Sequence, residues 1–283
     1  QLMVTLASVA TQSANASMWE CIVVDNNSAD DTSERVTDFI EEHPTLNIRY
    51  CFEQNQGLSH ARNRGISEAA GDIIAFIDDD ERIVPEFIKA YIKLFDEYPE
   101  AMAAGGKIVA EYPTGRPRWM SHYTERPIAN PMDFGDYIAP FPKGRIPGGG
   151  NMALRREVFT TVGLFNTSLG RTGKRLIGGE ESDLFERIAS RGMKCYYAPR
   201  AVMYHIIPQE KLTEEYFERL CYNTGVSQLT RAQIHNHTTR LYIGEVVKWC
   251  ATLLLCLFHR PIQSRYLIKM RRNITRGIFS HNG

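Results

Sequence analysis

Four consecutive acids, Asp78, Asp79, Asp80 and Glu81, follow the apolar run IIAFI at 73–77 in this chain of 283 residues. Adjacent carboxylates repel one another, so the cluster costs stability unless a cation lies among them. Alternation along an extended chain would place Asp78 and Asp80 on one face. There they could share a hard divalent cation and, through it, substrate phosphates. The alternative is a solvated turn in which Glu81 begins a helix.

A parallel sheet covered by helices is predicted to position these acids, because short β-branched runs alternate with helical periodicity in the first half of the chain. The run 72–80 reads as a strand buried on both faces. In open α/β sheets, ligands bind outside the carboxyl ends of the strands, where the acids fall. Further strands are expected at 21–26 and 48–54, and helices at 30–43, 58–70 and 85–98.

The chain opens with a helix, since Leu2, Leu6 and Val9 repeat at helical spacing. A domain of this kind normally begins with a strand that leads into this helix, so we expect an N-terminal first strand to be missing. Later in the chain we expect strands at 101–112, 151–156 and 194–206, an irregular stretch at 113–150, a loop at 169–179 that includes Lys174 and Arg175, a helix at 179–192, and three helical segments from Thr213 onward.

Composition excludes fibrous and disordered classes, with 43% hydrophobic and 23% charged residues. Six cysteines show no zinc-type spacing and indicate reduced thiols of a cytosolic protein. The start lacks the features of a signal peptide. The uncharged apolar run Trp249–Phe258 has ten residues, fewer than the ~20 that a spanning helix needs. We therefore expect a cytoplasmic protein.

The net charge of zero hides a basic C-terminal tail. Residues 246–283 hold seven bases and no acid, whereas the first 245 residues hold 26 bases and 33 acids. An apolar stretch followed by bases is typical of an interfacial anchor on anionic lipid, so we expect peripheral contact with the inner face of the membrane. An ordinary packing helix is the alternative. Nucleic acid is not expected as a partner, because no recognised binding module accompanies the bases.

Five segments together resemble family 2 glycosyltransferases of the GT-A fold, in the order and at the approximate spacings of that family. The resemblance covers residues 1 to about 207, and no single segment would suffice. It implies an α/β fold with a GT-A type nucleotide-binding, mixed, mostly parallel sheet flanked by helices, and a C-terminal helical extension. The segments are VVDNNSADDT (23–32), NQGLSHARNRGI (55–66), IIAFIDDDERIVP (73–85), GGGNMALRREVFTTVGLF (148–165) and GEESDL (179–184).

The resemblance also implies a domain plan and an activity. Residues 1–210 would form the catalytic domain, with a nucleotide-binding part at 1–112 and an acceptor part at 113–210, and residues 211–283 the basic extension. The expected reaction is metal-assisted, inverting sugar transfer from a nucleotide-diphosphate sugar, a UDP-sugar by expectation, to a hydroxyl of a glycan or lipid-linked acceptor, as in polysaccharide biosynthesis. The alternatives are a nucleotidyltransferase and a non-catalytic module that binds sugar or divalent cations.

Donor binding is implied for Asp25, Arg62, Asp78, Asp79 and Asn151. Asp25 would read the nucleotide base, Arg62 would contact base or phosphate, and Asp78 would approach the ribose, with Asp79 in the middle of the Asp-x-Asp pattern. Asn151 follows three glycines that permit a turn close to donor or acceptor. The alternatives are an Asx-type cap for Asp25 and a surface arginine paired with Glu68 for Arg62.

A metal site is implied at Asp80, with His205 completing the coordination from the opposite side of the cleft. The ion would be Mg²⁺ or Mn²⁺, and it would neutralise the diphosphate leaving group. A hydrogen-bonded structural histidine is the alternative for His205.

The catalytic base is implied at Glu181, within the second acidic cluster, because an inverting transfer needs a carboxylate close to the acceptor hydroxyl. The family has Asp at this position. Glu carries an extra methylene, so either the backbone lies further back or the role moves to Asp183. The alternative is that these acids only complement the dipole of the helix they begin.

Overall fold

The computed structural model describes residues 1–173 and 176–280, so Lys174 and Arg175 of the predicted loop lie outside the described residues. The chain divides into two compact units, which are described separately below. The predicted division into nucleotide-binding, acceptor and extension parts stays a prediction, because compactness does not report what a segment binds. Unit 1 comprises Gln1–Val109, Met132–Ser168 and Glu180–Ile206, and unit 2 comprises Ala110–Pro131, Leu169–Gly179 and Ile207–Gly283.

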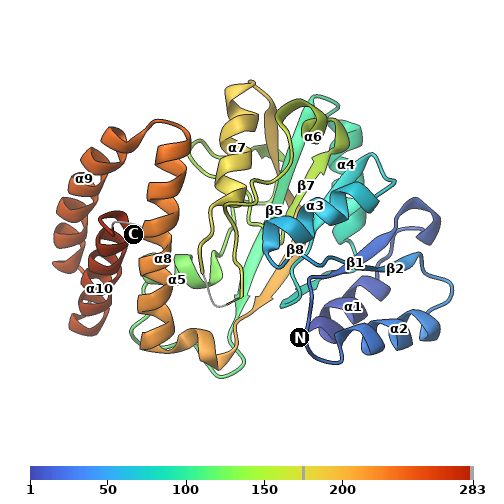
Figure 1. Cartoon of the computed structure of the whole chain (residues 1–283), viewed down its shortest axis with the longest axis horizontal. Coiled ribbons are helices and arrows are strands. Elements are labelled where there is room, and N and C mark those ends of the chain that lie inside the picture. Colours follow the sequence, from blue (N-terminus) through green and yellow to red (C-terminus); the bar gives the residue numbers. More distant parts are fainter. Residues whose placement is uncertain (174–175, 281–283) are drawn as a thin grey trace. The chain divides into compact units, whose positions relative to one another are not determined.

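Unit 1 alternates helices and strands as the periodicity predicts, and its elements can be followed in Figure 1. The opening helix is confirmed. The strand expected ahead of it stays a prediction. The elements are α1 (Leu2–Ala10), β1 (Cys21–Asp25), α2 (Thr32–Glu42), β2 (Ile48–Phe52), α3 (Leu58–Glu68), β3 (Ile73–Phe76), β4 (Glu81–Ile83), α4 (Phe87–Glu97), β5 (Ala101–Glu111), β6 (Ala139–Pro140), β7 (Met152–Arg155), α6 (Arg156–Val162), α7 (Glu180–Ser190) and β8 (Lys194–Ile206).

The strands of unit 1 form a mixed arrangement. Strands β1 and β2 pair in parallel, with Cys21 opposite Ile48. The larger sheet has the order β3-β7-β5-β8-β4, with β6 on β8. In it β3–β7, β5–β7, β4–β8 and β6–β8 pair antiparallel. The mixed α/β sheet is confirmed, with more antiparallel pairing than the early alternation indicates. The reason is that β7 and β8 follow the irregular stretch and α7 rather than successive helical crossovers.

Apolar side chains spaced for one buried face explain how the helices pack. Val36 and Phe39 of α2 lie with Leu6 of α1 against Val23 and Ile48 of the β1–β2 pair. A second cluster holds β3 and β7 against α6 and α7, including Ile74, Leu154, Phe159, Leu184 and Ile188. These two cores fix the strand ends and helix starts that carry the polar residues described below.

Two sequence expectations within 72–150 need correction. The strand ends at Phe76, earlier than expected, and residues 77–80 connect it to β4, which lies at the opposite edge of the sheet. Asp78 and Asp80 therefore do not share a strand face, because the alternation of side chains holds only along extended backbone. The irregular stretch also contains a helix, α5 (His122–Ala129), which begins with a capping box between Ser121 and Thr124.

Unit 2 contains α5 and three long helices, as predicted for the C-terminal region: α8 (Glu214–Ile234), α9 (Thr238–Cys256) and α10 (Pro261–Ile278). Gly225 and Gly277 let α8 and α10 approach closely, since a Cβ at Gly225 would lie 2.0 Å from the carbonyl oxygen of Ile274. Tyr266 and Phe217 fill the core between these helices. Among the described residues, no helix combines the length and apolar character needed to cross a membrane.

Candidate functional site

Arg62 joins the two acidic clusters of the sequence inside unit 1. Its Nη1 lies 3.0 Å from Glu180 Oε1 and 3.0 Å from Glu181 Oε1, and its Nη2 lies 3.3 Å from Asp78 Oδ1. The side chain is 5% exposed, and its guanidinium carbon lies 5.5 Å from the ring centre of Phe165. A buried cation among three carboxylates is therefore the centre of the candidate site.

Three elements bring these groups together. Helix α3 presents Arg62, and Asp78 lies in the turn that follows β3. Helix α7 begins at Glu180, so Glu180 and Glu181 occupy its first turn, where the helix dipole favours carboxylates. The alternative that these acids only complement the helix dipole is thus partly correct. It does not explain why both of them contact Arg62.

Glu81 supports the acidic turn from inside the protein. It is 3% exposed, and its Oε2 accepts a hydrogen bond of 2.9 Å from the main-chain N–H of Asp78. Burial, with repulsion from Asp78 and Asp80, raises the pKa of Glu81 well above its ordinary value. The solvated-turn alternative is correct for the turn, in which Asp79 is exposed, and wrong for Glu81, which is buried and begins β4 rather than a helix. Its role was missed because four adjacent acids look equally exposed in the sequence.

Two glycines allow the backbone to lie directly against these carboxylates. A Cβ at Gly149 would lie 2.1 Å from Glu181 Oε1 and 2.4 Å from Arg62 Nη2. A Cβ at Gly150 would lie 2.1 Å from Glu81 Oε1. Any side chain would displace these groups. The run of three glycines was the signal in the sequence, but the sequence did not show which residues they face.

Glu180 and Glu181 have opposite electrostatic environments. Burial, with repulsion from Glu181, raises the pKa of Glu180 to about 8. Burial acts most strongly on Glu181 too, against its ionisation, but the charge of the Arg62 guanidinium together with hydrogen bonds from Glu180, from the backbone and from Arg62 lowers the pKa of Glu181. At neutral pH the pair thus holds a neutral Glu180 beside an ionised Glu181. An ionised carboxylate can accept a proton, so this arrangement suits Glu181 to general-base chemistry.

Glu180→Gln should flatten the pH dependence of stability. Glu180 keeps its proton up to about pH 8 in the folded chain, against an ordinary pKa of 4.5, so folding stability falls as pH rises between these values. Glutamine cannot ionise. Between roughly pH 5 and pH 8.5, the unfolding free energy of Glu180→Gln should rise by about 2–4 kcal/mol relative to that of the unaltered chain.

Urea unfolding at both pH values measures this shift. Glu157→Gln, an exposed substitution on α6, is the control and should show no such change. A difference between Glu180→Gln and the unaltered chain that stays constant with pH would contradict the raised pKa.

Asp80 and His205 lie close to each other, and their role as metal ligands stays a prediction. His205 Nε2 lies 3.6 Å from Asp80 Oδ2, and His205 pairs with Glu81 across β4 and β8. Among the described residues, no three His, Cys, Asp or Glu side chains are grouped to hold a metal ion. One carboxylate and one imidazole fit a divalent ion that takes its remaining ligands from water and substrate phosphates, as Mg²⁺ commonly does.

The structure tests the alternatives that we gave for Asp25 and Arg62. Asp25 Oδ1 accepts the N–H of Ser28 at 2.9 Å, and its Oδ2 accepts the hydroxyl of Tyr50 at 2.8 Å, so Asp25 does cap its turn. The surface pairing of Arg62 with Glu68 is wrong, because Arg64 makes that ion pair at 2.9 Å. The nucleotide contacts of Asp25 and Arg62 stay predictions. Asp79, which is exposed, also remains a candidate.

Asn151 is not placed to bind a donor. Its side chain is completely buried, accepts the hydroxyl of Tyr91 at 2.6 Å, and donates to the carbonyls of Lys107 and Ala201. Tyr91 and Ala201 are buried, and Lys107 is half-buried. Asn151 therefore ties strands together, and the donor-binding prediction is corrected. The glycines before it gave a correct signal for a close approach, but the residue after them points into the sheet.

Asp183 is tied to another residue of its own helix. It is buried, and its Oδ2 accepts hydrogen bonds of 2.7 Å and 3.1 Å from Arg187. Arg187 in turn donates to the carbonyls of Val162 and Leu164. This network anchors α7 to the segment after α6. The geometry therefore favours Glu181 over Asp183 as the base.

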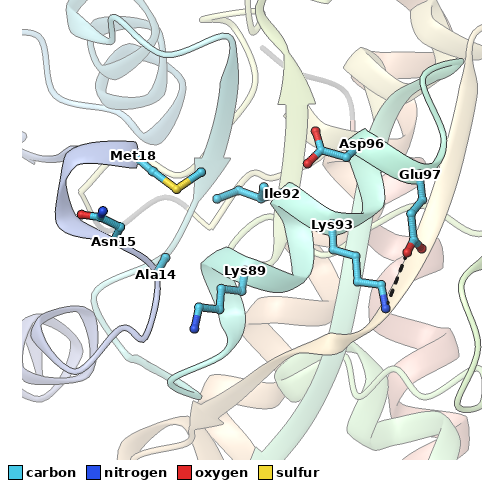
Figure 2. Close-up of a pocket in the computed structure, with 8 residues that line it drawn as sticks. All are labelled: Ala14, Asn15, Met18, Lys89, Ile92, Lys93, Asp96 and Glu97. Atoms are coloured by element: carbon cyan, nitrogen blue, oxygen red, sulfur yellow. Dashed lines mark ion pairs between the residues drawn. The ribbon is translucent and has the colours of Figure 1, made fainter.

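A cavity of about 390 Å³ lies elsewhere in unit 1. Figure 2 shows Met18 and Ile92 on its wall and the Lys93–Glu97 ion pair of α4 beside it. None of the acids described above lines it, so we assign the chemistry to the Arg62 cluster. The lining residues are Ala14, Asn15, Met18, Lys89, Ile92, Lys93, Asp96 and Glu97.

Known proteins share both the sequence pattern and the fold. The chain is 28% identical over 192 residues to a Haloferax volcanii glucosyl-dolichyl phosphate glucuronosyltransferase, a match that covers 65% of this chain and 58% of the relative. The Pyrobaculum calidifontis mannosyltransferase PcManGT, solved with GDP-Man and Mn²⁺, has a TM-score of 0.63 at 15% identity and covers 98% of this chain and 83% of that one. GalNAc-T7 with UDP, GalNAc and Mn²⁺ has a TM-score of 0.55 at 16% identity and covers 80% and 45%.

These matches confirm the GT-A type fold. The chain spans 58% of the length of the Haloferax relative. Residues 2–163, more than half of the chain, match the profile of Glycosyl transferase family 2. This chain belongs to glycosyl transferase family 2.

Proposed function

We propose that this chain catalyses inverting, metal-assisted transfer of a sugar from a nucleotide-diphosphate donor to a hydroxyl of a glycan or lipid-linked acceptor. The observation that supports it best is the Arg62 cluster, which unites Asp78 after β3 with Glu181 at the start of α7. Such a transfer needs at least an acid that helps to bind the donor and a base that takes the acceptor proton. Asp78 and Glu181 both contact Arg62 and could fill these two roles.

In the proposed step, the acceptor oxygen attacks the anomeric carbon while the bond from that carbon to the diphosphate oxygen breaks. Glu181 takes the hydroxyl proton, and the nucleoside diphosphate leaves from the opposite face, which inverts the anomeric centre. Arg62 keeps Glu181 ionised and holds its carboxylate against Gly149. Neutral Glu180 beside it adds no second charge.

Donor binding is proposed for Asp78 and Asp79, with Asp25 and Arg62 on the nucleotide side. Asp80 and His205 would hold Mg²⁺ or Mn²⁺, which would offset the charge that develops on the leaving diphosphate. Similar structures contain UDP or GDP-Man together with Mn²⁺, which supports a nucleotide-diphosphate sugar and a divalent ion. A UDP-sugar is our first choice for the donor.

A cytoplasmic site of action is proposed, with the acceptor drawn from glycans or lipid-linked sugars. The Haloferax relative is named for glucosyl-dolichyl phosphate, which supports the lipid-linked class. Product formation from labelled nucleotide-sugars tests this proposal against a non-catalytic binding module. A chain that binds donor and metal without turnover would favour the module.

Asp80→Ala should weaken Mn²⁺-dependent binding of UDP by about 100-fold or more, because it removes the one carboxylate ligand proposed for the ion. The measurement is calorimetric titration of UDP and GDP with and without Mn²⁺. Asp136→Ala, an exposed substitution in unit 1, is the control and should bind normally. If the Asp80→Ala chain is folded and its Mn²⁺-dependent affinity is unchanged, the metal assignment is wrong.

A further inference from the structure

Helix α9 exposes large apolar side chains to solvent and buries a charged one, the reverse of an ordinary surface helix. Its large apolar side chains at 243, 246, 247, 253, 254 and 257 recur at helical spacing and so form one stripe, which we call the α9 stripe. Its side chains and Phe258 beside it are 56% to 79% exposed. Folded chains rarely leave so continuous an apolar surface in water without a binding role.

Polar contacts on the opposite side of α9 fix this orientation. Glu245 is 3% exposed and accepts a hydrogen bond of 2.9 Å from Arg271 and one of 2.6 Å from Thr275, both on α10. The indole N–H of Trp249 donates to the same Thr275 hydroxyl at 2.9 Å. Rotating α9 to bury its stripe would expose or break this buried ion pair. The stripe therefore faces outward because of specific contacts within unit 2.

The exposed charged side chains of the segment that carries the stripe are all basic, whereas the acids Glu214 and Glu218 of the neighbouring helix α8 pair with Lys269 of α10. From Thr238 to Ser280 the sole acid is Glu245, which is buried against Arg271, so no exposed acid is present in this described segment. α9 lies beside α8 and α10 in unit 2, as Figure 1 shows. The exposed bases of the segment are Arg240, Lys248, Arg260, Arg265, Arg272 and Arg276.

We propose that the α9 stripe inserts into the surface of a membrane rich in anionic lipid, with the surrounding bases at the headgroups. Apolar residues flanked by positive charge match the acyl boundary and the anionic headgroups together. A second copy of the chain fits less well, because a symmetric contact through the stripe would bring both sets of bases close together. This inference does not depend on the reaction, since binding can be measured without donor or acceptor.

The test is sedimentation of the full chain with vesicles of phosphatidylcholine alone and with about 30% phosphatidylglycerol. We expect binding to the anionic vesicles at low salt. The substitution pair Leu254→Glu and Leu257→Glu should weaken it by about tenfold or more, because each removes inserted apolar surface. Arg260→Gln should weaken it by about fivefold, and high salt should act in the same direction.

Tyr137→Glu is the matched control, since Tyr137 is 84% exposed in unit 1 and lies outside the stripe. It should sediment like the unaltered chain, and circular dichroism should show every variant folded. Absence of binding to anionic vesicles overturns the proposal, as does equal binding by the Leu254/Leu257 variant. A dimer in light scattering that this variant dissociates also overturns it, because a second copy then covers the stripe.

Discussion

Glu181→Gln should lower the rate of sugar transfer by about 10² to 10⁴-fold while leaving donor binding within a few fold, because glutamine keeps the shape of the side chain but cannot accept a proton. The structure sharpens this expectation. Arg62 lies 3.0 Å from the Glu181 carboxylate and holds its pKa low, so the unaltered residue is ionised and ready at neutral pH. Single-turnover transfer from a labelled nucleotide-sugar measures the rate, and calorimetry measures the affinity for the donor.

Asp183→Asn is the companion variant, because Asp183 is the other candidate base and lies in the same helix turn. Its bond to Arg187 is structural, so the substitution should lower stability and leave the rate per folded molecule within about tenfold. The reverse result, a normal rate for Glu181→Gln with a large loss for Asp183→Asn, would transfer the base to Asp183.

Arg62→Met should destabilise the chain by about 3–5 kcal/mol, because it leaves the ionised Glu181, together with Asp78 and the neutral carboxyl of Glu180, without the buried cation that they share. Methionine preserves much of the apolar contact with Phe165, so the loss would reflect charge rather than a cavity. Without the guanidinium, the folded chain would hold protons on these carboxyls to higher pH. Its deficit in stability should therefore be smaller near pH 5 than near pH 8.

Arg64→Met is the matched control on the same helix. Arg64 is 42% exposed and pairs with Glu68 one turn away, an arrangement that contributes about 0.5 kcal/mol or less. Urea unfolding of both variants at the two pH values decides the matter. Equal, small losses for Arg62→Met and Arg64→Met would show that the cluster at Arg62 is a surface ion pair after all.

Much of the fold was predictable because periodicity reports local geometry. The alternating runs placed β1, β2 and β3 and the helices α2, α3 and α4 within a few residues of their bounds. The short strand β4 was missed because three residues between a turn and a proline-led helix show no period. Helix α6 was missed because it follows β7 without a break and has seven residues, too few to show a clear helical period.

The sequence by itself determined that acids follow a buried strand, that a second acid cluster begins a helix, and that the C-terminal tail is basic, since these are properties of adjacent residues. The tertiary structure decided which of them meet. Arg62 and Glu180 are 118 positions apart, and Arg62 and Asp78 are 16 apart, so neither contact leaves a trace in local spacing. The outward face of α9 was also undetermined, because a helical stripe does not show which side is buried. The ion pair of Glu245 with Arg271 settles that choice, since burying a charge is costly unless its partner lies on the same side.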